Sequence, residues 1–191
     1  MVAKILKLFL FFSLLQFLRP AEASYGPTAV YRWFEAPKVV VCKFAPVDAA
    51  RVRRALSVWK RLGYSFGSVV YNDESSRCIR EDYKGVIVID LIGQDFVEPN
   101  LAMTRVYYDK RWSRIIGAKI QIKQTSAERD RVLEHEIGHA LGWKHFSRRY
   151  HLMNPKWETG GWDTSGLTFK ALQRKIAVSE PGEIGVIEYV E

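Results

Sequence analysis

The sequence predicts an α+β fold, with strands and helices in separate parts of one domain. A short apolar strand followed by a helix opens the pattern, and three β-rich runs lie between residues 86 and 122. Helical patterns return after residue 125 and again near residue 169. Strands grouped apart from helices are typical of α+β domains. Residues 24–191 are long enough for one domain with a sizeable core.

The opening elements follow from valine content and from helix-end signals. Lys38 to Phe44 is rich in β-branched residues and predicts a strand. The next pattern predicts a helix from about Asp48 to Leu62, because Asp48 is a suitable N-cap and Gly63 is a suitable stop. The chain therefore begins with a strand followed by a helix.

Three further strands are predicted in the middle of the chain. Val86 to Leu91 is apolar except at Asp90 and predicts a strand. Leu101 to Tyr108 and Ile115 to Ile122 are β-rich, and the polar residues Asp109-Lys110-Arg111 join them. These last two runs predict a hairpin.

Two helices are predicted in the C-terminal part. Thr125-Ser126-Ala127-Glu128 has the form of a capping box for a helix that carries His135 and His139. Thr164 or Ser165 could cap a final helix. The apolar face and the end of that final helix are predicted at Phe169, Leu172, Ile176 and the dipeptide Pro181-Gly182.

The first 23 residues have the pattern of a signal peptide. Lys4 and Lys7 precede an apolar run from Leu8 to Leu18, and Ala21-Glu22-Ala23 has the small-x-small form of a cleavage site. We therefore expect a secreted or periplasmic protein with no membrane span after cleavage. An uncleaved membrane anchor is the alternative.

Basic residues give the whole chain a formal charge of +8, and about +6 without the signal segment. We interpret the charge as a solvated face of the first helix, whose opposite side carries Val52, Leu56 and Trp59. An anionic surface or an acidic substrate is the alternative, and nucleic-acid binding is not expected. The basic residues of that face are Arg51, Arg53, Arg54, Lys60 and Arg61.

Two histidines and a glutamate occupy one short helical stretch. His135 and His139 are four residues apart, so both imidazoles lie on one helix face and can reach the same metal ion. Glu136 follows the first ligand by one position, where its carboxylate could take a proton from metal-bound water. The spacing predicts Glu136 as a general base.

A third ligand is predicted just beyond the helix. Gly142 tolerates the positive φ that lets the chain leave a helix abruptly, and His145 can then return to the metal. Three imidazoles leave one tetrahedral position open for water, which is typical of a catalytic zinc site. A structural zinc site is the alternative. His151, the remaining histidine, is expected to be an exposed loop residue that does not bind zinc.

The pattern from His135 to His145 resembles the metzincin signature. Leu152-Met153-Asn154-Pro155 is similar to the methionine turn of that family, and Val132-Leu133-Glu134 suggests its matrixin branch. The resemblance implies a zinc-dependent endopeptidase with one catalytic Zn²⁺ and a twisted mixed sheet. It also implies an upper part that ends near residue 142 and a small helical subdomain over residues 143–191.

The same resemblance implies where a peptide or protein substrate binds. Leu101 to Tyr108 would be the edge strand that pairs with an extended substrate, although an ordinary sheet strand is equally compatible. Residues from Lys156 to Trp162 would border the specificity pocket, unless Trp157 and Trp162 pack structurally. The candidate substrate-binding residues are Leu101, Ala102, Met103 and Thr104.

Cys42 and Cys78 are the two cysteines of the chain, and export favours a disulfide between them. The alternative is that one thiol binds and inhibits the zinc, as in matrixin zymogens.

Other positions depart from the matrixin pattern. The chain has no histidine before His135, so a second, structural zinc is not expected. Phe146 stands where matrixins usually have serine after the third histidine, and serine follows only at Ser147. Asn72-Asp73-Glu74 could offer oxygen ligands to calcium, but a solvated acidic turn is the alternative, and calcium stays open.

These observations predict a secreted zinc-dependent endopeptidase. Two alternatives stay open: a zinc amidase or peptidase that acts on cell-wall peptides, and a catalytically silent zinc-fold module that binds a partner. Glu136 favours an enzyme, because a pure binding module has no chemical need for a base beside an open zinc position.

Overall fold

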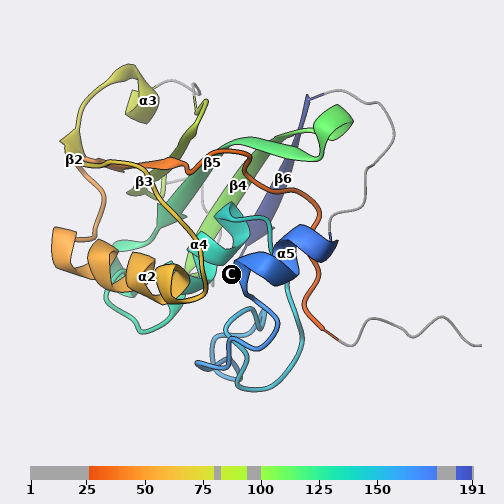
Figure 1. Cartoon of the computed structure of the whole chain (residues 1–191). Helices are drawn as coiled ribbons and strands as arrows, with labels where there is room; N and C mark the ends of the chain where they lie inside the picture. Colours follow the sequence, from red (N-terminus) through yellow and green to blue (C-terminus); the bar gives the residue numbers. More distant parts are fainter. Residues whose placement is uncertain (1–25, 80–82, 94–99, 176–183, 191) are drawn as a thin grey trace, which may run out of the picture.

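A computed structural model of the chain describes residues 26–79, 83–93, 100–175 and 184–190 (Figure 1). The predicted signal peptide lies outside the described residues, as do Ile176 and the dipeptide Pro181-Gly182. Among the described residues, no helix is long and apolar enough to cross a membrane.

A six-stranded mixed sheet forms the centre of the described chain (Figure 1). The first four strands across it are mutually parallel, and the next strand runs antiparallel to both of its neighbours. The mixed sheet predicted from the sequence is therefore confirmed. In order across the sheet, the strands are β2 (Val69–Asp73), β1 (Lys38–Cys42), β3 (Val86–Leu91), β5 (Arg114–Ile122), β4 (Ala102–Asp109) and β6 (Ile184–Val190).

The predicted hairpin is confirmed, because β4 and β5 pair antiparallel. A short 3-10 helix, η2 (Lys110–Trp112), joins them, and Ser113 turns the chain with φ 47°. The prediction missed β2 and β6. The small helical subdomain predicted over residues 143–191 contains a helix, but residues 184–190 form β6, which returns to the sheet and pairs with β4.

The first long helix, α2 (Ala49–Arg61), begins and ends at the predicted signals. The Asp48 side chain accepts a hydrogen bond of 2.6 Å from the backbone N–H of Arg51, and Gly63 has φ 92°. A carboxylate that accepts from an N–H of the first turn stabilises a helix start. A short helix, α3 (Ser76–Ile79), follows β2.

The histidine-bearing helix, α4 (Val132–Ala140), begins later than predicted. The predicted capping box instead overlaps a 3-10 turn, η3 (Gln124–Ser126). The Ser126 hydroxyl donates to the Leu101 carbonyl at 2.5 Å, so this side chain bonds to the residue before β4 and does not cap α4. Arg131, with φ 72°, directly precedes α4.

The last helix, α5 (Phe169–Lys175), is capped at a different residue from the one predicted. The Thr168 hydroxyl accepts a hydrogen bond of 3.2 Å from the Ala171 N–H, so the cap is Thr168 rather than Thr164 or Ser165. Leu172 is buried on this helix, as its apolar face predicted.

Alternation along β1 divides the core between the two faces of the sheet. Val39 and Val41 pack in the main cluster, which includes the apolar side chains of α2 and α4. Val40 and Cys42 pack on the other face in a smaller cluster that includes Tyr83. Successive strand residues point to opposite faces, so each face has its own core.

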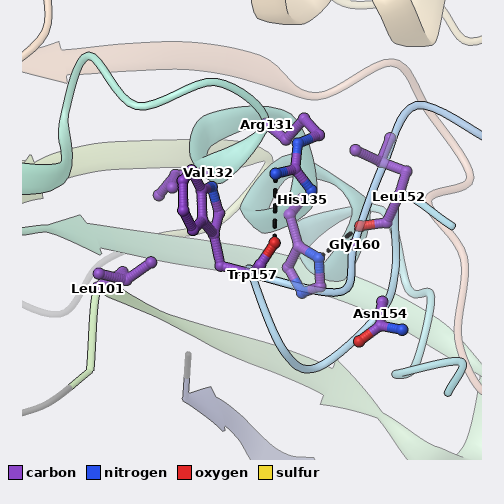
Figure 2. Close-up of a pocket in the computed structure, with 8 residues that line it drawn as sticks. All are labelled: Leu101, Arg131, Val132, His135, Leu152, Asn154, Trp157 and Gly160. Atoms are coloured by element: carbon purple, nitrogen blue, oxygen red, sulfur yellow. Dashed lines mark hydrogen bonds between the residues drawn. The ribbon is translucent and has the colours of Figure 1, made fainter. Parts of the chain in front are cut away.

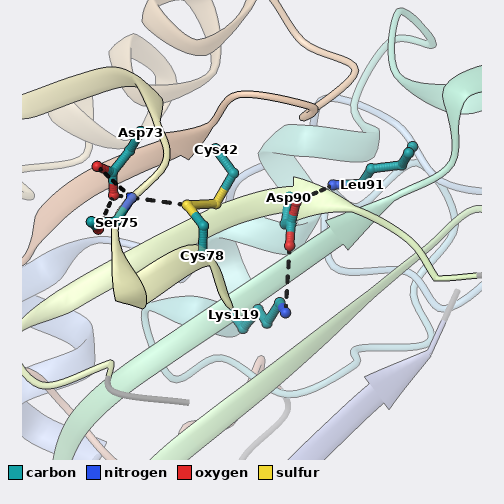
Figure 3. Close-up of a disulfide and its surroundings, with 7 residues drawn as sticks. All are labelled: Cys42, Asp73, Ser75, Cys78, Asp90, Leu91 and Lys119. Atoms are coloured by element: carbon teal, nitrogen blue, oxygen red, sulfur yellow. Dashed lines mark hydrogen bonds and ion pairs between the residues drawn. A yellow bond between two sulfur atoms is a disulfide. The ribbon is translucent and has the colours of Figure 1, made fainter. Parts of the chain in front are cut away.

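Cys42 and Cys78 form a disulfide that links β1 to α3 (Figure 3). The predicted pairing is confirmed, and no described cysteine is a free thiol. Disulfides persist in oxidising compartments, so the bridge indicates an extracellular or other oxidising environment.

Candidate metal centre

Three histidine side chains converge beside the sheet. His135 and His139 lie one turn apart on α4, and His145 reaches them from the chain that follows the helix. One ligand atom of each histidine lies within 4.8 Å of the others. No other group of His, Cys, Asp or Glu side chains in the described ranges meets this condition. The predicted ligands are therefore brought together and could hold a metal ion.

Backbone carbonyls determine which ring nitrogens of two histidines carry a proton. His135 Nδ1 lies 2.7 Å from the Leu152 carbonyl oxygen, and His139 Nδ1 lies 2.7 Å from the Trp143 carbonyl oxygen. A carbonyl oxygen only accepts, so both Nδ1 atoms donate. In neutral rings both Nε2 atoms then carry lone pairs, and these atoms lie 2.8 Å apart. Two facing lone pairs repel unless a cation lies between them, so this donor set fits a metal ion.

Burial keeps His139 in the form that binds metals. Its ring is fully buried, and desolvation lowers the pKa of His139 well below 6.5. The nearby His135 and His145 lower it further. An imidazole that stays neutral near pH 7 offers its lone pair without first losing a proton.

Gly142 makes the turn that brings His145 back to the helix. Its φ of 107° is unfavourable for other residues, and a Cβ at this position would collide with the Tyr31 carbonyl oxygen. Just beyond it, the Lys144 N–H donates to the Thr28 carbonyl at 2.9 Å. The segment near residue 28 therefore supports the chain that leads to His145.

Glu136 is fully buried and points toward β4 rather than to solvent. The Thr104 hydroxyl donates to Glu136 Oε2, and its oxygen also lies 3.3 Å from the Glu136 carbonyl. Sequence reasoning placed Thr104 among the substrate-binding residues and missed this contact. No local pattern could have found it, because the two residues are 32 positions apart.

Met153 packs against the histidine-bearing helix at Gly138. Its side chain is fully buried, and a Cβ at Gly138 would collide with its sulfur. The Phe146 N–H donates to the Met153 carbonyl at 2.7 Å, which joins this turn to the residue that follows His145. Gly138, between the two helical histidines, therefore lets the turn approach α4 closely.

His151 is buried, so the predicted exposed loop position was wrong. Its Nδ1 accepts a hydrogen bond of 3.1 Å from the Met153 N–H, which requires Nε2 to donate to the Ser165 carbonyl at 3.1 Å. Desolvation lowers the pKa of His151 below 6.5. This histidine holds the turn around Met153, and it is absent from the metal-binding cluster.

A small pocket opens beside His135 (Figure 2). Trp157 lines it, and the Arg131 guanidinium donates to the Trp157 carbonyl at 3.2 Å. Trp162 is 51% exposed and lies outside this lining. The lining residues are Leu101, Arg131, Val132, His135, Leu152, Asn154, Trp157 and Gly160.

Of the two alternatives for β4, the ordinary sheet strand is the one observed, because β6 pairs with its outer side and β4 has no free edge. Of the candidate substrate-binding residues, Ala102, Met103 and Thr104 are buried, and only Leu101 lines the pocket. Tyr189 of β6 stacks on the His139 ring, with 4.0 Å between ring centroids and 6° between planes. Burial raises the pKa of Tyr189 to about 12, so its phenol stays protonated.

Arg51 does not belong to the solvated basic face that was predicted. It is 2% exposed and makes a buried ion pair with Glu134 of α4. The remaining basic residues of that face, Arg53, Arg54, Lys60 and Arg61, are exposed as predicted.

The carboxylates of the acidic turn that was considered for calcium bond to nearby side chains and backbone. Asp73 accepts hydrogen bonds from the Ser75 hydroxyl and N–H (Figure 3), and Glu74 pairs with Lys43 at 2.8 Å. These contacts favour the solvated acidic turn over a dedicated calcium site.

No protein-family model and no curated protein matches this chain.

Proposed function

We propose that this protein is a secreted zinc-dependent endopeptidase. The observation that carries the proposal is the convergence of His135, His139 and His145 beside the buried carboxylate of Glu136. Three imidazole donors and an adjacent base are the parts that metal-assisted hydrolysis requires.

Zinc is the metal that we propose for the centre. Imidazole nitrogens suit Zn²⁺, and a site with three protein ligands keeps a fourth position open for catalysis. When bound, zinc would lower the pKa of water toward about 7 and polarise the carbonyl of the scissile peptide bond. The histidines hold the metal, and their bonds to the Leu152 and Trp143 carbonyls orient the rings.

Glu136 is the proposed general base. Its carboxylate takes a proton from the attacking water and passes it to the leaving amine. The Thr104 hydroxyl, through its hydrogen bond to Oε2, restricts the rotamers of this side chain. Thr104 is therefore a positioning residue in the proposed mechanism.

The proposed secretion has two independent supports. The first 23 residues have a signal-peptide pattern, and the Cys42–Cys78 bridge indicates an oxidising compartment. The metzincin resemblance adds the endopeptidase activity to the zinc chemistry, because its signature spans all three ligands and Glu136.

The decisive experiment is incubation of the zinc-loaded protein with a mixed peptide library, followed by mass spectrometry of the products. Glu136→Ala is the matched control, and its zinc content should equal that of the unmodified protein. We expect cuts by the unmodified protein alone, and a rate in the variant lower by at least about 100-fold. Equal cutting by both would remove Glu136 from its role.

The same experiment separates the alternatives. Cleavage limited to cell-wall peptides would favour the amidase. Zinc bound in both proteins, with no cleavage of either peptide class by the unmodified protein or by a variant in which strand β6 is released from β4, would contradict the peptidase and favour the silent binding module.

A further inference from the structure

The C-terminal strand occupies the side of β4 on which we expected a substrate. β6 pairs antiparallel with β4 from Ile184 opposite Asp109 to Val190 opposite Met103. This arrangement is the one that an extended peptide adopts when it joins a sheet edge. The chain therefore supplies its own peptide to the strand that borders the histidines.

The end of β6 covers the metal-binding cluster. Tyr189 lies opposite Thr104, the residue that contacts Glu136. Its ring stacks on His139 and meets His145 edge-on, with 5.9 Å between those centroids. With β6 in place, His139 is 0% exposed and His135 is 5% exposed. Tyr189 therefore covers the His139 ring, whereas His145 stays partly exposed and His135 borders the pocket that Trp157 lines.

The residues of β6 that face the molecule pack against neighbouring side chains. Ile187 and Tyr189 pack against the cluster that contains Val106 and Tyr108. A Cβ at Gly185 would collide with the Tyr108 ring, so glycine suits this place. The alternate residues, including Val186, face solvent.

The attachment of β6 has the features of a displaceable element. β6 is the outermost strand, so it has a strand partner on one side only. The ion pair between Arg105 Nε and Glu188 Oε2, at 2.6 Å, has side chains 35% and 45% exposed. Exposed ion pairs contribute little, and edge elements with few buried contacts open before the core does.

We propose, building on the peptidase function proposed above, that β6 is an intramolecular inhibitory strand that occupies the binding site for extended peptides. A peptide that pairs with β4 needs the same backbone N–H and C=O groups that β6 uses. The two strands therefore exclude one another, and the free energy of docking β6 is subtracted from the affinity for any peptide. Displacement of β6 exposes both β4 and the histidines.

The test uses the full chain with single changes in β6, away from the histidines. Ile187→Asp places a charge in the apolar cluster and should release the strand. Glu188→Arg places two like charges opposite one another, and the exchange Arg105→Glu with Glu188→Arg restores the pair as a matched control. Val186→Asp, on the exposed face of β6, controls for a charge that leaves docking intact. Equal zinc content and a cooperative thermal transition will show that each variant is folded.

The readout that does not depend on catalysis is binding of a labelled synthetic peptide, monitored by fluorescence polarisation. The peptide has the sequence of residues 184–190 with alanine in place of Glu188, so that it brings no charge opposite residue 105 in any variant. Each variant is combined with Glu136→Ala so that the peptide stays intact. We expect the Ile187→Asp variant to bind the labelled peptide at least about tenfold more tightly than the protein with unmodified β6 does. Glu188→Arg should give a smaller gain, about fivefold, that the charge exchange reverses.

Peptide hydrolysis is measured in parallel on the variants that retain Glu136. A gain in binding with a matching gain in hydrolysis supports the inhibitory strand. A gain in binding without hydrolysis in any protein also supports the strand, and contradicts the peptidase instead. Equal binding in all the proteins would place the peptide elsewhere, for example on the outer side of β6, and would overturn the inference. Hydrolysis that is detectable and equal in all the proteins would also overturn the inference and leave the peptidase intact.

Discussion

Arg51 and Glu134 join α2 to the histidine-bearing helix through an ion pair inside the core. Two parallel hydrogen bonds connect them, Nη1 to Oε1 at 2.7 Å and Nη2 to Oε2 at 2.8 Å. The side chains are 3% and 4% exposed. Arg51 also donates to the Arg129 carbonyl at 3.3 Å, just before α4 begins. The pair thus anchors the helix that carries two of the three histidines.

Removing one partner of this pair should destabilise the protein strongly. Arg51→Met leaves the Glu134 carboxylate buried without its guanidinium, and we expect a loss of about 3–5 kcal/mol in the free energy of unfolding. Urea denaturation of the variant measures the loss. The exposed pair of Arg54 and Glu128, whose atoms lie 3.6 Å apart, offers a matched control. Arg54→Met should cost less than about 1 kcal/mol, and equal losses would contradict the buried role of Arg51.

The disulfide should account for a large part of the stability. Cys42 and Cys78 are separated by 36 positions, and closing a loop of that size stabilises by about 4 kcal/mol in the chain-entropy description. Replacing both cysteines with alanine should lower the melting temperature by about 10 °C. Reductant should lower the melting temperature of the unmodified protein and leave that of the double variant unchanged. If the double variant melts at the same temperature as the unmodified protein, the bridge contributes no stability.

Zinc should stabilise the folded chain through the histidine cluster. A ligand that binds only the folded state adds about 2.7 kcal/mol at a concentration one hundred times its dissociation constant. We therefore expect calorimetry to give a higher melting temperature with Zn²⁺ than without it. His145→Ala removes one ligand from the cluster and should abolish most of this shift. His151→Asn should retain the shift, since His151 is not a predicted ligand. Stabilisation by zinc that survives His145→Ala would place the metal elsewhere.

His151 should make stability depend on pH below its ordinary pKa of 6.5. Burial lowers the pKa of His151 in the folded protein, so as pH falls through 6.5 the unfolded chain binds a proton before the folded chain does. Protonation then favours unfolding, and stability is lost toward acid by at most about 1.4 kcal/mol per pH unit.

The comparison with His151→Asn isolates this contribution. We expect the stability advantage of the unmodified protein, measured by denaturant unfolding at one zinc concentration, to shrink between pH 7.5 and pH 5.5. Effects of pH on the other histidines cancel in the difference. An advantage that stays constant with pH would show that His151 does not titrate differently in the two states.

Local patterns predicted the elements that short-range physics controls. Asp48 and Gly63 mark the ends of α2 because capping depends on neighbouring backbone groups. His135 and His139 lie together because the helix repeat places residues four apart on one face. The β-rich composition of the two hairpin segments predicted β4 and β5 in the same way.

Contacts between residues distant in the sequence determine the burial of side chains that was not predicted. Arg51 has the same local pattern as its exposed neighbours, and its burial depends on Glu134, which lies 83 positions away. His151 is buried because the turn at Met153 folds back on it. These environments follow from how elements pack, which residue type and spacing do not encode.

The sequence by itself determined that His135 and His139 share one helix face with Glu136 beside them, because helix geometry is local. It also determined the cysteine pair, because two cysteines allow one pairing. Only the tertiary structure decided that Thr104 holds Glu136 and that Tyr189 covers His139. Strand pairing is the physical reason. Any β-capable segment can add to an exposed edge, and the choice of β6 for β4 depends on the packing of Ile187 and Tyr189 against residues distant in the chain.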